Sequence, residues 1–407
     1  MISKNNDMKK VLLFNLLLIS SLSFAQDSTI TLIQDAIFDR PFIDNTTSKT
    51  AIGGYLEANS NYFIEDGLGE GLSFEMRRFN IFLYSSISER IKFLAELEFE
   101  HGTEEIALET ALLDFRVNES LNLRAGILLP QIGIVNANHD SPKWDIIDRP
   151  LSSSLIIPTT LSEVGFGVFG KFYLGNNTLS YDAYIVNGLQ DGIVLNEEGI
   201  TSISSGKSEE AFGEDNNGTP MYNGRVSISN REFGEFGLSY YGGVYNSYLM
   251  EGEEVDEKRS LHLIALDFST NIKKLSIKGE YVKALIDVAE DIDESYGTEQ
   301  NGGFIQATYP IIEKTMFGYT KAKINAVVRA EAVDLNQGTF KSNFTHTSTI
   351  EGNEIGNDIK AFVLGVSFRP TSSTTFRANY RKHWSTDILN NPPAMMAGFQ
   401  FGFASFF

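Results

Sequence analysis

The stretch that decides the fold is the last one, Met395–Phe407, which reads MMAGFQFGFASFF. One face of a two-residue repeat is aromatic, with Ser405 as its interruption, and carries Phe399, Phe401, Phe403 and Phe407. The other face is small or polar apart from one phenylalanine, and carries Gln400, Gly402, Ala404 and Phe406. Such a strand suits a wall between lipid and water. The alternative is an edge strand of a soluble β-sandwich, which would expose these phenylalanines to aggregation.

This stretch resembles the closing strand of bacterial outer-membrane β-barrels. In those proteins a terminal aromatic residue is part of the signal that the barrel-assembly machinery reads. The resemblance implies that Phe407 is the assembly signal. It also implies a location in the outer membrane of a Gram-negative bacterium, with the assembly machinery, membrane lipid and lipopolysaccharide as partners.

The composition of the whole chain narrows the choice of class. The 407 residues contain no cysteine, which excludes a disulfide framework and thiolate chemistry. The mean hydropathy is −0.12, and the one long apolar run lies at the N-terminus, so a protein built of membrane-spanning helices is excluded. The net charge of −20 argues against nucleic acid as a partner.

The N-terminus predicts two short segments before the barrel. Residues 1–25 read as a secretory signal peptide, with Lys9 and Lys10 before the apolar run Val11–Phe24 and a small-x-small cleavage site at Ser23–Ala25. Residues 26–50 show no sustained period and are expected to form a periplasmic arm. The barrel is expected over 51–407.

From Ile52 onward the two-residue period predicts an all-β fold, a transmembrane antiparallel barrel of about sixteen strands. Short connections, such as Ser88–Arg90 and Asn118–Ser120, alternate with longer ones, such as Glu65–Ser73 and His101–Ile106. That alternation is typical of tight periplasmic turns and long external loops. Sixteen strands would enclose an aqueous lumen, and fourteen or eighteen remain open.

The third external loop is expected at Gln131–Leu161. It contains Pro142, Pro150 and Pro158, and it carries apolar side chains that need a surface to bury against, namely Trp144, Ile146, Ile147, Leu155, Ile156 and Ile157. In sixteen-stranded porins generally, the loop at this place folds into the barrel, so we expect residues 131–161 to form a constriction. The alternative is an external cap or a loop at a trimer contact.

Four segments resemble the phosphate-selective porin O and P family: Arg77–Phe99, Leu123–Ile134, Glu163–Phe172 and Phe362–Tyr380. The resemblance implies a sixteen-stranded homotrimeric barrel that passes small solutes passively. Members that select phosphate line the constriction with lysines and arginines. Here Gly126–Pro130 has no lysine, so phosphate selectivity is not implied.

The expected pore-lining residues come from the loop and from inward positions of the strands. The loop supplies Lys143 and Arg149 against Asp140, Asp145 and Asp148. The strands supply Lys92, Glu96, Arg116, Arg124, Arg329 and Glu331. Such charges would orient and filter solutes, or would only pair and stiffen the wall. Weak selectivity is predicted, leaning to cations or neutral solutes.

The sequence gives little support for catalysis, cofactor binding or metal binding. The histidines are scattered, with no HExxH and no G-x-S-x-G pattern, and His139 beside Asp140 is the nearest approach to a catalytic pair. We therefore predict no enzyme, no cofactor and no metal, and we interpret the acidic external loops as a solvated rim. The competing function is a plugged or receptor-type barrel that binds an extracellular partner.

Overall fold

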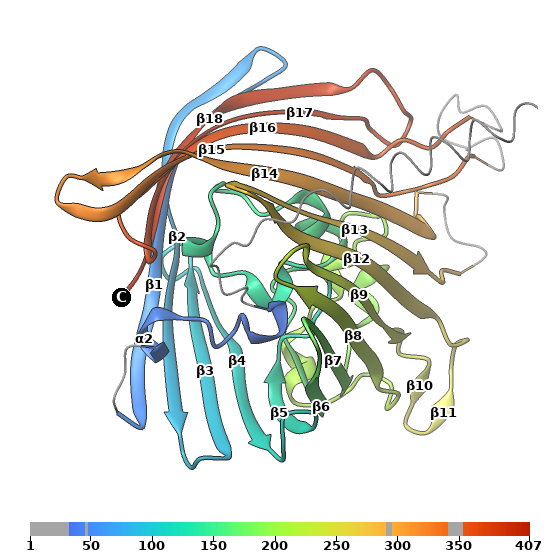
Figure 1. Ribbon diagram of the computed structural model, residues 1–407. Helices are drawn as coiled ribbons and strands as arrows, with labels where there is room; N and C mark the ends of the chain where they lie inside the picture. Colours follow the sequence, from blue (N-terminus) through green and yellow to red (C-terminus); the bar gives the residue numbers. More distant parts are fainter. Residues whose placement is uncertain (1–31, 45–47, 290–294, 341–352) are drawn as a thin grey trace, which may run out of the picture.

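The computed structural model describes residues 32–44, 48–289, 295–340 and 353–407, so the predicted signal peptide lies outside the described residues. The strands form a closed barrel in the order β1-β18-β17-β16-β15-β14-β13-β12-β9-β8-β7-β6-β5-β4-β3-β2, which confirms an antiparallel barrel of sixteen strands (Figure 1). A separate two-stranded sheet, β10-β11, lies in a connection.

The wall of the barrel is made of long strands. Their bounds are β1 Thr50–Glu65, β2 Leu68–Ser86, β3 Ile91–Glu100, β4 Glu105–Arg116, β5 Asn122–Leu128, β6 Glu163–Leu174, β7 Asn177–Val186, β8 Met221–Asn230, β9 Gly234–Val244, β12 Ser260–Ile272, β13 Leu275–Ile286, β14 Glu299–Met316, β15 Tyr319–Asp334, β16 Asp358–Arg369, β17 Thr374–Ser385 and β18 Ala394–Phe406. The small sheet pairs β10 Leu249–Met250 with β11 Glu253–Glu254.

The helical pieces are all short. They are η1 Ile33–Asp35, α2 Pro41–Asp44, η2 Asn136–Asn138, η3 Ser141–Lys143, the π-helical turn η4 Ser152–Ile156, η5 Asp191–Ile193, η6 Ser204–Gly206 and η7 Glu209–Phe212. None of the helices in the described ranges is long and apolar enough to cross a membrane.

The closing strand, β18, pairs with β1, and its two faces differ as its sequence predicts. Phe399 and Phe401 keep 50% and 53% of their surface exposed on the outer face, whereas Phe406 is buried against Tyr55 on the inner face. The Phe407 amide donates to the Gly54 carbonyl at 3.0 Å, and the Gly54 amide donates back at 3.3 Å. A side chain at Gly54 would collide with the Phe407 ring, so the closing contact is shaped for glycine.

The connections keep the predicted alternation, with two corrections of length. The expected loop Glu65–Ser73 is strand, because β1 and β2 turn at Asp66 and Gly67, both at positive φ. Likewise β14 and β15 run on to a turn at Phe317 and Gly318, where the sequence pattern weakens. The short turns define the periplasmic end by the general rule for these barrels. The long connections fall at 129–162, 187–220, 245–259, 287–298 and 335–357.

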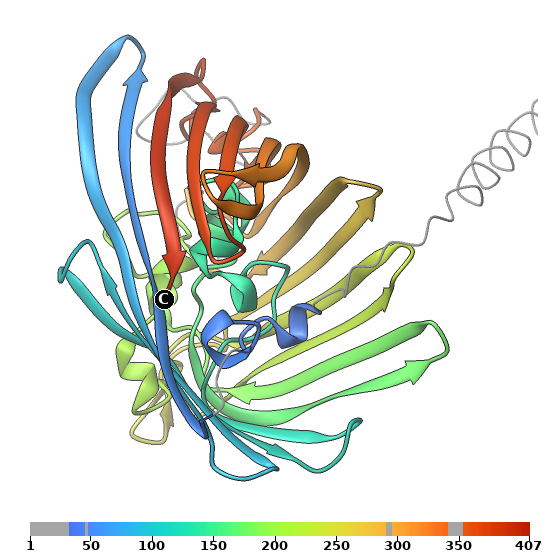
Figure 2. The same cartoon turned by 60° about the vertical axis from the view of Figure 1, so that its left-hand side comes forward.

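Two segments lie inside the ring of strands (Figures 1 and 2). One is the connection between β5 and β6, which contains the expected third loop. The other is the stretch 32–44, part of the segment expected as a periplasmic arm. Its Arg40 bonds to Glu96 on β3, and its Ile33 bonds to Glu235 on β9, so these residues lie within the barrel and not clear of it.

Candidate functional site: the interior of the barrel

The third loop is fixed to the inner wall by hydrogen bonds along its length. Near its start, the Ile134 amide donates to the Glu280 carboxylate on β13 at 2.9 Å. Near its middle, the Leu151 amide donates to Glu331 on β15 at 2.6 Å, and Arg329 donates to the Asp148 carbonyl at 3.0 Å. A carboxylate buried on the barrel wall must find hydrogen-bond donors, and the loop amides supply them to Glu280 and Glu331. These bonds hold the loop inside the lumen.

Each of the three loop aspartates is bound by cations. Asp145 accepts from Arg369 on β16 at 2.7 Å. Asp148 lies 2.9 Å from Arg77 on β2 and 3.6 Å from Arg381 on β17. Burial opposes the charge of Asp148, but Arg77 and Arg381 outweigh it and lower the pKa of that carboxyl. The predicted acidic excess of the loop is thus cancelled by cations of the wall.

The two basic residues of the loop differ in their surroundings. Lys143 Nζ lies 3.0 Å from the Asp140 carboxylate and donates to the Ala36 carbonyl at 2.7 Å. Arg149 donates only to the Thr159 carbonyl, at 2.8 Å, and its Nε and Nη2 are buried without a partner among the described residues. Burial and the charge of Arg78 lower the pKa of Arg149.

The structure does not gather the predicted wall residues into one site. Arg329 pairs with Glu331 at 2.9 Å beside the loop, and Arg124 pairs with Asp114 at 2.7 Å nearer the periplasmic end. Lys92 and Arg116 are exposed there, and neither has an ion-pair partner among the described residues. Lys92, Arg116 and Arg124 line the periplasmic cavity described below, and that these strand residues line a conducting pore stays a prediction.

The strand period places Arg377 and Glu57 on the inner face, but sequence reasoning did not predict their contact with the loop and missed Arg40. Arg377 donates to the Glu57 carboxylate at 2.9 Å and also to the Ser141 hydroxyl at 3.0 Å. Arg40 donates to Asp140 through two nitrogens, at 2.9 and 3.0 Å. The one available signal for Arg40 was its place near the apolar pairs Ile37–Phe38 and Phe42–Ile43 in a segment that has no strand period.

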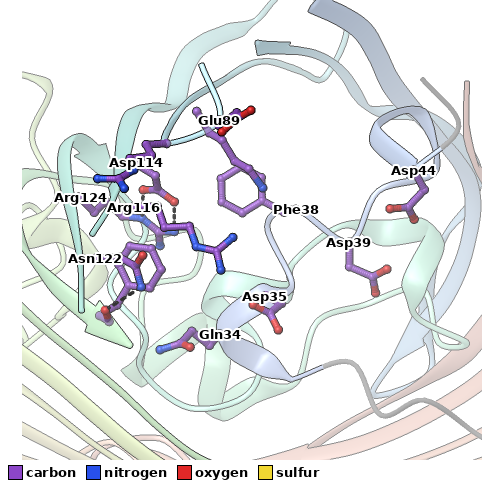
Figure 3. Close-up of a pocket in the computed structure, with 13 residues that line it drawn as sticks. Gln34, Asp35, Phe38, Asp39, Asp44, Glu89, Asp114, Arg116, Asn122 and Arg124 are labelled. Atoms are coloured by element: carbon purple, nitrogen blue, oxygen red, sulfur yellow. Dashed lines mark hydrogen bonds and ion pairs between the residues drawn. The ribbon is translucent and has the colours of Figure 1, made fainter. Parts of the chain in front are cut away.

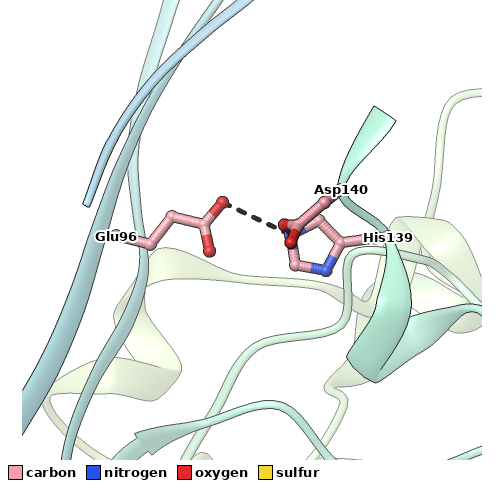
Figure 4. Close-up of side chains that lie close together, drawn as sticks. All are labelled: Glu96, His139 and Asp140. Carbon is pink, nitrogen blue, oxygen red and sulfur yellow. Dashed lines mark hydrogen bonds and ion pairs between the residues drawn. The ribbon is translucent and has the colours of Figure 1, made fainter. Parts of the chain in front are cut away.

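Glu96, His139 and Asp140 form a buried cluster (Figure 4), and Arg40 completes it by binding both carboxylates. The ligand atoms of the last three lie within 4.8 Å of one another, close enough to hold a cation. The Arg40 guanidinium already bonds both carboxylates, so it supplies the positive charge there. Burial lowers the pKa of His139, but the Glu96 carboxylate outweighs burial, and the net pKa is raised above its usual value.

Two cavities lie on opposite sides of the loop. The periplasmic one has a volume of about 420 Å³, and segment 32–44 and the ends of β3, β4 and β5 line it (Figure 3). The extracellular one has a volume of about 460 Å³, and its charged lining consists of Arg77, Arg78, Asp148, Arg149, Arg381 and His383. The interior thus offers polar, charged space at both ends.

Comparison with known proteins identifies the fold. No protein-family profile matches the chain. An uncharacterized protein of Aquifex aeolicus is 28% identical over 363 residues, which cover 84% of this chain and 77% of that protein. Among solved structures, OmpF of Salmonella typhi in complex with daunomycin matches with a TM-score of 0.53 and 9% identity, over 88% of this chain and 98% of that chain.

Two further structures match to the same extent. A loop-L8 deletion mutant of OmpT, an outer membrane protein of Vibrio cholerae, gives a TM-score of 0.53 at 10% identity, over 88% of this chain and 100% of that chain. The anion-selective porin of Comamonas acidovorans gives 0.51 at 11%, over 88% and 99%. The chain therefore has a porin-type barrel fold, while the expected membership of the phosphate-selective family is not confirmed.

These matches settle the location and correct one prediction. The closed barrel with an apolar outer face is an outer-membrane protein of a Gram-negative bacterium, as predicted. The prediction that the chain is not an enzyme goes too far, because the matched structures include OmpT beside porins. One barrel fold can carry different activities, so the shared fold does not exclude catalysis.

Proposed function

We propose that the protein is a porin that lets small hydrophilic solutes or ions diffuse passively across the outer membrane. The observation that carries the proposal is the barrel interior. Sixteen strands place charged side chains inward, and a cavity of about 420 or 460 Å³ lies on each side of the third loop. Polar cavities lined by both signs of charge suit hydrated solutes and water-filled conduction.

We further propose that the third loop narrows the channel. The support is its set of hydrogen bonds to β13 and β15 and the arginines that reach its backbone from β16 and β17. A loop held inside the lumen reduces the free width of the channel, while the strands of the barrel stay continuous. The predicted constriction residues on the loop, from Asp140 to Arg149, lie at these contacts.

The selectivity that we propose is weak. Asp140, Asp145 and Asp148 are all paired with arginine or lysine, so the loop presents little net charge of either sign to a passing solute. The resemblance to the phosphate-selective family supports passive passage alone. A high-affinity phosphate site is not part of the proposal, and a slight preference for cations or neutral solutes remains the prediction.

Single-channel recording on the purified protein in planar bilayers tests the function. We expect ohmic steps of uniform size. A variant with residues 141–147 replaced by a glycine-serine linker should give larger steps while the barrel still migrates as a folded, heat-modifiable band. A silent bilayer would favour the competing receptor-type barrel, whose lumen stays closed. Unchanged steps in the loop variant would place the constriction elsewhere.

We also propose a homotrimer held by the outer wall, with lipopolysaccharide and the assembly machinery as partners. The support is an apolar hollow of about 620 Å³ across β1, β2, β17 and β18, lined by residues that include Phe74, Met76, Phe376, Phe401 and Phe403. Chemical cross-linking in native membranes tests the trimer. A ladder that stops at three copies is expected, and Phe74→Glu should weaken it.

A further inference from the structure

The segment 32–44 crosses the lumen and is attached to the wall at both ends. At its start, the Ile33 amide donates to Glu235 on β9 at 3.0 Å, and Gln34 donates to the Asp182 carboxylate on β7 at 3.0 Å. At its end, the Phe42 ring stacks on Phe82 of β2 with centroids 5.8 Å apart. The segment therefore spans from one side of the barrel to the other.

Arg40 fastens the segment to both the wall and the third loop. Its Nη2 donates to Glu96 on β3 at 2.8 Å, and its Nε and Nη2 donate to the Asp140 carboxylate at 3.0 and 2.9 Å. Its guanidinium lies 3.6 Å from the centroid of the Phe82 ring. The arginine is buried, so one side chain joins three parts of the molecule in a setting where such bonds are strong.

Apolar contacts add a second connection between the segment and the loop. Ile33 belongs to the same buried cluster as Ile134 and Trp144 of the loop. The backbone also takes part, since the Ala36 carbonyl accepts a hydrogen bond from Lys143. Loop and segment thus pack as one body. The loop bonds mainly to β13–β17. The segment bonds to β3, β6, β7 and β9 and stacks on β2.

The segment also changes the charge of the periplasmic cavity (Figure 3). It contributes Asp39 and Asp44, both exposed, while the wall contributes Arg90, Lys92 and Arg116 against one exposed acid, Glu89. None of these six has an ion-pair partner among the described residues. Opposite charges on two sides of a cavity produce a transverse field that orients a dipolar solute.

We infer that residues 32–44 form a second constriction in series with the third loop, with Arg40 as the residue that positions both. The inference rests on the proposed passive channel and adds to it the element that shapes the periplasmic exit. Dipolar solutes such as zwitterions, which carry both charges, are the class that this exit would orient.

Single-channel recording of three proteins tests the inference: the wild type, a variant without residues 33–43, and Arg40→Ala. Removing one of two equal resistances in series raises conductance roughly twofold, and we expect a step of that order for the deletion. Arg40→Ala should give larger and noisier conductance steps, because the ion pair that connects the segment to the loop is lost. Arg231→Ala is the matched control, since it removes an exposed arginine on the turn between β8 and β9 that lines neither cavity and has no ion pair among the described residues.

The outcomes separate the inference from the proposed function. Silence of all three proteins overturns both. A silent wild type with a conducting deletion variant supports the segment as an obstruction and overturns passive conduction by the native chain. A conducting wild type whose steps are unchanged in the deletion variant overturns the inference alone.

A cysteine experiment keeps the test decisive if the deletion variant does not fold. The chain has no cysteine, so Asp39→Cys carries the single thiol. A bulky thiol reagent on that residue should reduce the current of the open channel by at least half. Leu195→Cys, exposed on the connection between β7 and β8, is the control and should leave the current unchanged. Full labelling of Asp39→Cys without a loss of current would overturn the inference.

Discussion

The third loop and the segment 32–44 both lie in the lumen, but they are held there differently. The loop is bound at many points, and each of its aspartates meets cations from strands or from the segment. The segment has a second ion pair with the wall, between Asp35 and Lys171 on β6, but it depends on Arg40 for its ion pair with the loop. A distributed set of bonds tolerates single losses better than one shared joint, so we expect the two elements to respond differently to mutation.

The difference also shows what a barrel wall contributes. Arg377, Arg369 and Arg381 reach the loop from neighbouring strands, so the wall offers a row of donors at fixed spacing. The segment meets the wall at separate strands instead: Arg40 binds Glu96 on β3, Gln34 binds Asp182 on β7 and the Ile33 amide binds Glu235 on β9. The loop is therefore held by a row of neighbouring strands, whereas the segment is held by single contacts on opposite sides of the barrel.

The largest expected effect is on barrel assembly, and it compares the loss of the C-terminal residue with the loss of the segment. Deleting Phe407 should impair assembly far more than deleting Gln26–Lys49, because Phe407 exchanges two backbone hydrogen bonds with Gly54 and stacks on Phe79. The folded fraction, measured by heat-modifiable migration of outer-membrane fractions, checks this. If the deletion of 26–49 abolished folding and the loss of Phe407 did not, the segment would be part of the fold itself.

The sequence predicted the barrel well because its signal is local. Alternation along β18 is visible within a few residues, and the strand count and the end of the chain follow from the same pattern. The third loop was also predictable, since prolines and apolar side chains such as Trp144 mark a long connection that must bury itself. Each of these signals lies in a continuous stretch.

The partners inside the barrel were not predictable for the opposite reason. Arg377 and Ser141 are separated by 236 residues, and their contact depends on the register of the barrel. The prediction of a preference for cations is affected most, because it treats Asp145 and Asp148 as unpaired charges. The segment 32–44 was taken for an arm because it lacks strand periodicity, and nothing in 26–50 tells where Arg40 points.

The second prediction tests the distributed attachment of the loop. Arg377→Ala should lower the free energy of unfolding by about 3–5 kcal/mol, because it leaves the buried Glu57 without its closest cation. Arg116→Ala, the exposed control, should change it by no more than about 0.5 kcal/mol. Urea unfolding midpoints in detergent measure both. A loss below about 1 kcal/mol would mean that Arg78, 3.3 Å from Glu57, replaces the missing partner.

The third prediction concerns pH at the joint between loop and segment. The charged groups that act on His139 are Glu96 from β3, Asp140 beside it, Arg149 from the loop and Glu109 from β4, and Arg40 binds Glu96 and Asp140. The pKa of His139 is raised in the folded protein, so its contribution to stability is fully present below the unfolded value of about 6.5. It is lost as the pH rises through the folded value.

Stability should therefore fall above pH 6.5 with a slope of at most about 1.4 kcal/mol per pH unit, the limit for one proton. The pH dependence of the urea midpoint between about pH 6 and pH 8.5 measures this slope, in the range where ordinary histidines titrate. His139→Gln should flatten it, because glutamine keeps a hydrogen-bonding group without the titration. A slope that persists in the variant would assign the effect to another group.

The smallest expected effect concerns selectivity and compares the two sets of aspartates. The loop aspartates are paired, whereas Asp39 and Asp44 of the segment are exposed in the periplasmic cavity opposite Lys92 and Arg116. Replacing both by asparagine leaves the three wall cations of that cavity in excess. The reversal potential under a potassium chloride gradient should then move toward anions. The shift should be small, because charges in water are screened over about 8 Å at physiological salt, and it should vanish near 1 M salt, where that length is about 3 Å.

Replacing Glu197 and Glu198, on the distant connection between β7 and β8, is the matched control and should leave the potential unchanged. An equal shift in that control would show that the mouth of the channel sets the selectivity and that the segment 32–44 does not.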